Sequence, residues 1–329
     1  MKILIRVAWV LGLGLMVWLL VRAGVTPILG LLSQAGWMLL WLIPLHALPL
    51  MLDALGWRAL LRHYCRSLML FAIAAVREAI NRLLPVANIG GEIVGIRLLT
   101  RLGVPGAEAA ASVIVEVSVT LVSQFLFVAL GVACLLHLTG LVHLAGAWLG
   151  LLGAVLPLLA GLFLALRSGR VFGWLQRLAA RVLGNSERML GLARQSAQLD
   201  EEIRRLCREP ARLGLALVWQ FAGLVTGCIE TWLALRWLGH PVGTAASVAI
   251  ESLTQAARQF IFIVPAGLGV QEASLIGLGE LLGVGSGVAL ALSLVKRMRE
   301  IIFGVPALLA WQWFEGRRDF LHVRSRSNN

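Results

Sequence analysis

Two glutamates, Glu92 and Glu272, stand 180 residues apart in apolar sequence, and each follows a segment that contains a proline and glycines. The prolines are Pro85 and Pro265, and the two segments align without a gap. Proline and glycine interrupt helices, so we expect each glutamate just after a helix break. Two broken helices at matching places in a membrane protein indicate a transport site, although glycine-rich apolar sequence also produces short matches by chance.

The polar and small residues around both breaks form a candidate binding site for a polar headgroup. A charged side chain at membrane depth costs about 2.5–3.5 kcal/mol on insertion and usually serves a function. An acid in the first turn of a helix also stabilises its free N–H groups, so a structural role for both glutamates stays open. Glycines let the backbone approach a ligand closely, and arginines bind phosphate. The candidates are Asn81, Asn88, Gly90, Gly91, Glu92, Arg97, Arg258, Pro265, Gly267, Gly269, Gln271 and Glu272.

Five more charged residues are candidates for ion coupling or for ion pairs. Glu116 and Lys296 are 180 residues apart and therefore equivalent in the repeat. This predicts an ion pair between them, or between Lys296 and Glu300 at helical spacing. Asp53 and Glu230 also occupy similar places in the two halves of the chain. A coupling-ion or proton role for Glu116 is the alternative to a structural ion pair.

The sequence carries no motif of a hydrolase, a metal site or a phosphate loop. Its six histidines are scattered, and neither H-E-x-x-H nor G-x-S-x-G occurs. Its four cysteines are far apart and form no C-x-x-C motif. We therefore expect no enzymatic activity, no cofactor and no metal.

The composition is that of an integral membrane protein. Of the 329 residues, 59% are hydrophobic, whereas a soluble domain has about 45–50%. The net charge of +12 does not indicate nucleic acid, because most basic residues lie in loops beside apolar segments, where lipid headgroups are the expected partner. A span needs about 20 apolar residues, and the predicted spans are 4–22, 37–60, 106–136, 143–166, 210–237 and 285–312.

Two further apolar segments, about 68–104 and 243–283, are broken in the middle and are predicted to be re-entrant helical hairpins. The arginine-rich groups fall on one side if six helices cross and both hairpins return, which places both termini in the cytoplasm. Three spans separate the hairpins, so they enter from opposite sides. The predicted fold is an all-α polytopic membrane protein with about six full transmembrane helices and two re-entrant hairpins in an inverted repeat.

The predicted repeats divide the chain at residue 142. The first repeat covers 1–142 and the second covers 143–315. A hydrophilic, amphipathic loop at 167–209 is interpreted as a cytoplasmic linker, with a regulatory role as the alternative. The segment 316–329 is a basic cytoplasmic tail.

The motif E-A-I-N-R-L-L-P-V-A-N-I-G-G-E at 78–92 resembles the signature of the flippase-like membrane domain family of lysylphosphatidylglycerol synthases, in its stand-alone form. The segment P-A-G-L-G-V-Q-E at 265–272 is similar to a second element of that family. The sequence of residues 81–92 and the segment D-A-L-G-W-R at 53–58 most resemble the hopanoid-biosynthesis-associated branch of the family. The resemblance covers nearly the whole chain.

This resemblance implies a flippase-like, transport-related protein of the bacterial inner membrane that moves a polar-headed lipid between leaflets. The expected lipid is a hopanoid, or else an anionic phospholipid, with its headgroup in a cavity between the two hairpins. Two other classes stay open. One is a membrane scaffold that holds lipid-biosynthetic enzymes, and the other is a membrane-embedded lipid transferase. The oligomeric state is open, with a dimer as the working expectation.

Overall fold

The computed structural model describes residues 14–16, 18–19, 21–22, 25–84, 90–169, 173, 187–261, 264 and 267–326. All regular structure in these residues is helical, as predicted. The first half contains α2 (Val25–Ala35), η1 (Gly36–Trp41), α3 (Leu42–Leu60), α4 (Ser67–Leu83), α5 (Gly90–Arg101) and α6 (Gly106–Thr139). The second half contains η2 (Val142–Leu144), α7 (Ala145–Ser168), α9 (Glu187–Leu206), α10 (Pro210–Trp237), α11 (Thr244–Phe260), α12 (Val270–Leu281) and α13 (Ser286–Arg326).

Four stretches of helix among the described residues are long and apolar enough to cross a membrane: Thr26–Leu60, Gly106–Thr139, Ala145–Ser168 and Pro210–Trp237. They contain the predicted spans 37–60 and 106–136, most of 143–166, and 210–237. The predicted span 4–22 lies mostly outside the described residues. The predicted span 285–312 lies within α13, whose charged residues near position 296 lower its hydropathy.

The helix boundaries repeat at the spacing seen in the sequence. The helices α5 and α12 begin at residues 90 and 270, and α6 and α13 begin at residues 106 and 286. The turns before α6 and α13 both contain a glycine with positive φ, Gly103 at 92° and Gly283 at 77°. A helix–break–helix arrangement is thus present in each half. Pro85, Asn88 and Pro265 lie outside the described residues.

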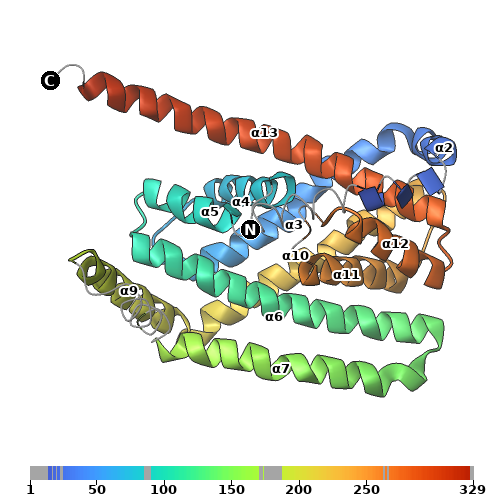
Figure 1. The fold of residues 1–329 in the computed structure, drawn as a ribbon, viewed down its shortest axis with the longest axis horizontal. Helices are drawn as coiled ribbons and strands as arrows, with labels where there is room; N and C mark the ends of the chain where they lie inside the picture. The colour runs from blue at the N-terminus through green and yellow to red at the C-terminus, as the bar shows by residue number, and fades with distance from the viewer. Residues whose placement is uncertain are drawn as a thin grey trace.

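The two broken pairs lie on either side of the middle of the molecule. The long helices α6, α7 and α13 run along its longest axis, with α4 and α5 toward the left of Figure 1 and α11 and α12 toward the right. Between them, α3 packs against α10, α4 against α13, and α11 against α6. The predicted inversion of the two halves stays a prediction. Whether each pair re-enters the membrane stays a prediction.

Each broken pair has a hydrophobic core of its own. One buried cluster joins residues of α3, α4, α5 and α6, including the fully buried Trp57 and Leu99. Another joins residues of α2, α10, α11, α12 and α13, including Leu235, Ile250 and Leu292. Phe303 and Ala307 of α13 also pack against the first cluster, so α13 connects the two clusters.

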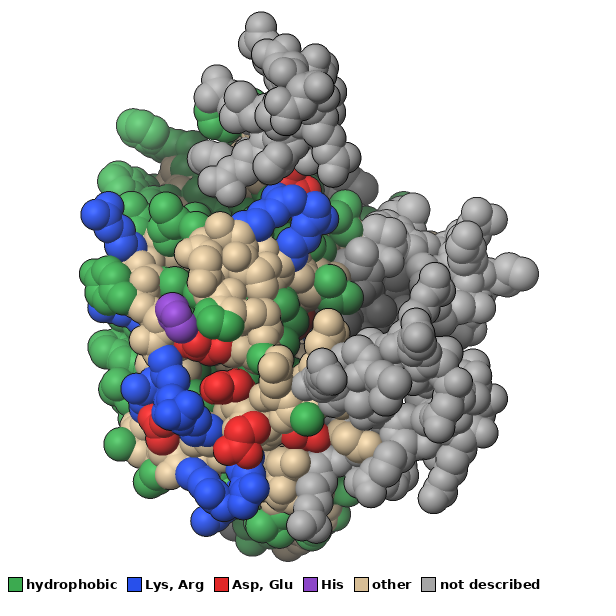
Figure 2. All heavy atoms as spheres, turned by 90° about the vertical axis from the view of Figure 1, so that its left-hand side faces the viewer, with side chains coloured by type: hydrophobic (Ala, Val, Ile, Leu, Met, Phe, Trp, Pro, Cys, Tyr) green, Lys and Arg blue, Asp and Glu red, His purple; other side chains and the backbone are tan. Residues whose placement is uncertain are grey.

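Charged side chains gather at one end of the molecule, as Figure 2 shows for the described residues. Arg62, in the turn after α3, pairs with Glu209 before α10 at 2.5 Å. Arg101, at the end of α5, pairs with Glu315 of α13 at 2.8 Å. These contacts bring together the arginine-rich segments that the sequence placed on one side of the membrane. Much of the predicted linker 167–209 lies outside the described residues, but α9 within it packs against α6 and α7.

Candidate functional site

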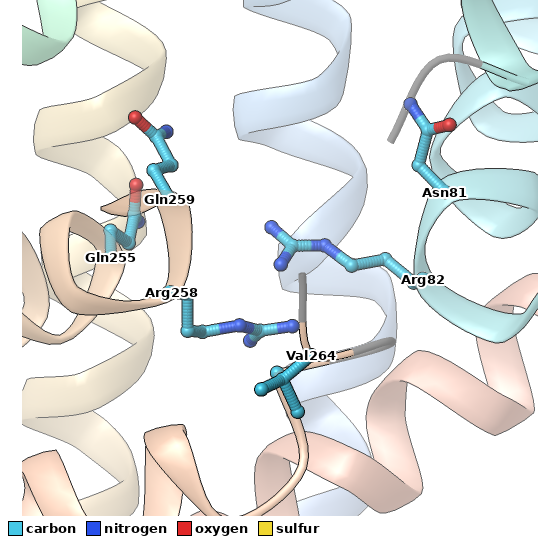
Figure 3. A pocket seen from close by; sticks show the side chains of 7 residues that line it. Asn81, Arg82, Gln255, Arg258, Gln259 and Val264 are labelled. Carbon is cyan, nitrogen blue, oxygen red and sulfur yellow. The ribbon is translucent and has the colours of Figure 1, made fainter. Parts of the chain in front are cut away.

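A polar cavity lies where α4 and α11 end beside the second break. Its volume is about 50 Å³, and it is lined by Asn81, Arg82, Gln255, Arg258, Gln259, Val264 and Gly267. Figure 3 shows Arg82 and Arg258 reaching toward one another from the two helices, with Gln255 and Gln259 on the same side as Arg258. Both broken pairs therefore contribute to one site, although they lie far apart in the sequence.

Two carboxylates that do not line the cavity lie close to its two arginines. Glu300 of α13 accepts a hydrogen bond from Nη1 of Arg258 at 3.0 Å. The same Oε1 atom is 4.0 Å from Nε of Arg82, and Oε1 of Glu78 is 3.8 Å from that nitrogen. Glu300 is 7% exposed, so the cavity itself presents guanidinium and amide groups. Such a lining suits a phosphate or a hydroxyl-rich headgroup.

At the first break, Asn81 ties the end of α4 to the start of α5. Its Oδ1 accepts the Gly91 N–H at 2.9 Å, and its Nδ2 donates to both oxygens of Glu92 at 3.3 and 3.2 Å. Glu92 is also 3.5 Å from Nη2 of Arg77. A Cβ at Gly91 would lie 2.5 Å from the Arg77 carbonyl oxygen, so the two helices approach closely only because this residue is glycine.

At the second break, Glu272 caps the start of α12. Its Oε2 accepts the Gly269 N–H at 2.7 Å, where Gly269 has a φ of 76° that favours glycine. Its Oε1 accepts the hydroxyl of Ser293 at 2.8 Å and lies 3.4 Å from Nε of Arg297. Arg297 also donates to the carbonyl of Gly267 at 3.1 Å. The second break is thus held by α13, and Glu272 serves as a helix cap.

Gln271 links the second break to the cavity. It is fully buried, its Oε1 accepts a hydrogen bond from Arg258, and its Nε2 donates to Oγ of Ser293 at 2.9 Å. Arg258 is therefore held by Gln271 and Glu300 from two different helices. This fixes its guanidinium at the cavity wall.

The predicted ion pair between Glu116 and Lys296 does not form. Glu116 pairs with Arg77 of α4 at 2.8 Å, and Lys296 pairs with Glu251 of α11. The predicted pairing of Lys296 with Glu300 is also absent among the described residues, because Glu300 pairs with Arg258. The physical reason is that each side chain meets an opposite charge on another helix, Arg77 of α4 for Glu116 and Glu251 of α11 for Lys296.

The structure brings some of the predicted binding residues together and leaves others elsewhere. Asn81, Arg258 and Gly267 line the cavity, while Gly91, Glu92, Gly269, Gln271 and Glu272 hold its frame. Gly90 begins α5. Arg97 was expected in the cavity, but its side chain is 58% exposed and lies 3.5 Å from Glu315 at the charged end. It sits seven residues beyond the start of α5, about 10 Å along the axis.

Of the remaining coupling candidates, Glu230 and Glu300 form ion pairs and Asp53 forms none within the described part of the chain. Glu230 pairs with Arg299 and with His46, and Glu300 with Arg258 and Arg297. Asp53 is half-buried and makes no hydrogen bond or ion pair with another described residue.

Sequence reasoning missed Arg82, Gln255 and Gln259 in the cavity and His46 beside it. Arg82 lies inside the motif at 78–92, and Gln255 and Gln259 are one helical turn apart beside Arg258, which was the available signal. His46 is isolated in sequence among leucines and prolines. Its partners come from other helices, so nothing near it in the chain indicates them.

Comparison with protein families gives one match. The model described as the lysylphosphatidylglycerol synthase TM region matches residues 3–307. No curated protein and no solved structure matches the chain.

Proposed function

Because the chain belongs to the family of lysylphosphatidylglycerol synthase transmembrane regions, a lipid-related membrane family, we propose that it moves a polar-headed lipid between leaflets. The membrane concerned is the bacterial inner membrane, with both termini cytoplasmic. The chain then acts as a transporter and not as an enzyme.

The observation that carries this proposal is the polar cavity between the broken pairs. Two arginines and three side-chain amides face it inside a bundle whose outer helices are apolar. Charged and amide groups in such a bundle need hydrogen-bond partners, so a cavity with this lining suits water or a polar ligand. A lipid with its apolar body in the bilayer can place a headgroup there.

The cavity in this structure is smaller than a headgroup site. Its volume of about 50 Å³ holds a few water molecules, whereas pockets for small ligands measure about 300–1,000 Å³. Binding therefore requires the two broken pairs to move apart. A polar cavity at the junction of the two pairs supports rocking of one half against the other, which opens the site to one leaflet at a time.

We propose a hopanoid as the first substrate to test, on the resemblance of residues 53–58 and 81–92 to the hopanoid-associated branch. The two arginines of the cavity equally suit the phosphate of an anionic phospholipid, which is the second substrate to test.

The test follows labelled lipid between leaflets in liposomes that contain the purified protein. Arg82→Gln is the most informative variant, because Arg82 lines the cavity and its ion contacts are long, at 3.8 and 4.0 Å. Loss of one charge-assisted hydrogen bond should slow lipid movement about tenfold or more. Arg97→Gln is the matched control, since Arg97 lies at the charged end and should leave the rate unchanged.

The outcomes separate the three classes of function. Movement of one of the two labelled lipids, slowed by Arg82→Gln and not by Arg97→Gln, supports a translocase. No movement of either lipid by a folded protein would contradict the proposal and favour a scaffold for lipid-biosynthetic enzymes. Chemical change of the labelled lipid, detected by mass spectrometry, would indicate a transferase.

A further inference from the structure

His46 of α3 lies between two glutamates from other helices. Its Nδ1 is 3.0 Å from Oε1 of Glu230 on α10, and its Nε2 is 2.9 Å from Oε2 of Glu78 on α4. His46 and Glu230 are 9% and 4% exposed, so water does not separate these groups. The edge of the imidazole ring also meets Phe303 of α13, with ring centroids 5.2 Å apart.

This geometry requires one proton more than a neutral histidine carries. A neutral imidazole has one N–H donor and one lone pair, and an ionised carboxylate only accepts hydrogen bonds. With two carboxylates at hydrogen-bond distance, one contact would place a lone pair against an oxygen. Both contacts form when each ring nitrogen bears a proton.

The neighbouring charges place that proton on His46 and not on a glutamate. On α13, Arg299 pairs with Glu230, and on α4, Arg82 lies 3.8 Å from Glu78. Both glutamates therefore have a cation of their own that stabilises the ionised carboxylate. Other charged groups near the cluster are Glu300 of α13, which pairs with Arg258, and Asp53 of α3, while Arg299 also lies near Glu78.

The side chain of Glu78 connects the cluster to the cavity. The two oxygens of Glu78 are divided between His46 and Arg82, and Arg82 lines the cavity. When His46 gives its proton to water, Glu78 loses its closer partner, and the Coulomb attraction on Arg82 then dominates. Arg82 is drawn back from the cavity, and a bound anionic or hydroxyl-rich headgroup loses a contact.

We propose that His46, Glu78 and Glu230 form a proton-binding site, and that the proton moves in the same direction as the lipid. The proposal rests on the proposed function, because it names the coupling ion of the same cavity. With His46 doubly protonated, Glu78 is satisfied and Arg82 is available to a headgroup. Lipid and proton therefore bind together and leave together.

The first experiment measures the proton site without any lipid movement. Spectra of ¹⁵N-histidine protein in lipid, with the His46 signal assigned by comparison with His46→Gln, report whether one or both ring nitrogens are protonated. We expect the doubly protonated ring on the acidic side of a pH series and the singly protonated ring on the alkaline side. A ring that keeps one form throughout the series overturns the inference and leaves the proposed function standing.

The second experiment imposes a pH difference of one unit across the liposome membrane. With one proton per lipid, the ratio of lipid between leaflets should shift by up to about tenfold toward the alkaline side. His46→Gln should abolish this shift. His63→Gln is the matched control, because His63 contacts a single glutamate, Glu108, through Nδ1 at 2.6 Å and should keep the full shift.

The results distinguish the two proposals. Lipid movement by the wild-type protein without any shift, or with a shift toward the acidic side, overturns the coupling and keeps the translocase. An equal loss of the shift in both histidine variants also overturns the role of His46. Absence of lipid movement in the wild-type protein contradicts the proposed function itself.

Discussion

Glu116 and Lys296 occupy equivalent positions in the two halves, carry opposite charges, and each pairs with the first helix of the broken pair in its own half. In the first half, the cation Arg77 is on α4 and the anion Glu116 is on α6. In the second half, the anion Glu251 is on α11 and the cation Lys296 is on α13. The two halves thus keep the place of one member of a buried ion pair and reverse its charge, whereas the partners Arg77 and Glu251 fall outside the 180-residue register.

We expect Glu116→Gln to lower the free energy of unfolding by about 3 kcal/mol or more, because it leaves the buried guanidinium of Arg77 without its closest anion. Denaturation in detergent, followed by tryptophan fluorescence, measures this change. The double variant Arg77→Met with Glu116→Leu should recover most of the loss, since neither member of this pair is left as an unpaired buried charge. A single variant as stable as the wild type would show that the pair contributes nothing.

Gly91→Ala should destabilise the protein by about 1–3 kcal/mol, because the new Cβ would overlap the Arg77 carbonyl oxygen and force α4 and α5 apart. Gly277→Ala on α12 is the control. No atom lies within 4 Å of its added Cβ, so alanine should stabilise that helix by about 0.5–1 kcal/mol. Thermal unfolding of both variants checks the prediction, which fails if their effects have the same sign.

If the two halves are inverted as the sequence predicts, two equivalent turns are accessible from opposite sides of the membrane. Pro105 precedes α6 and Gly285 precedes α13, and both are exposed. In a protein without its native cysteines, a membrane-impermeant thiol reagent should label Pro105→Cys from one side of the membrane and Gly285→Cys from the other. Labelling of both from the same side would contradict the inverted repeat.

The contact between Arg62 and Glu209 predicts a pH-dependent contribution to stability. The hydrogen bond from Arg62 lowers the pKa of Glu209, with Arg212 adding to the effect. The pKa of Glu209 is thus lower in the folded protein than in the unfolded chain. The stabilisation is therefore present at pH values above the ordinary glutamate pKa of about 4.3. It is lost as the pH falls through the folded-state pKa. Arg62→Gln should cost at most about 1 kcal/mol at neutral pH, since the pair is partly exposed, and nothing in acid. An equal cost at both pH values would show that Arg62 acts by packing.

Much of the fold was predictable, because membrane-spanning helices and helix breaks depend on the residue types within a short segment of the chain. Long apolar runs gave the four spans, and proline with glycine gave both breaks and their spacing. The register of the repeat followed from the same residues, down to the equivalent starts of α5 and α12. These properties depend on neighbours in the chain.

The partners of the charged residues were not predictable, because they depend on which helices pack together. Glu116 and Lys296 match in sequence, yet each faces the helix beside it. Glu92 and Glu272 hold helix ends, which was the structural alternative for both, and contact of either with a headgroup stays a prediction. The neighbours that make Arg82 and His46 part of a site come from α11, α10 and α13, which are distant in the sequence.

The helix α13 has 41 residues and is therefore about 60 Å long, twice the thickness of the hydrocarbon core. Near its start it holds the second break through Arg297 and the cavity through Glu300, and farther along Glu315 holds Arg101 of the first pair. Because α13 is one continuous helix with contacts at both places, a tilt of one end moves the other end as well. A partner that binds the C-terminal end of α13 can therefore act on the cavity through this helix.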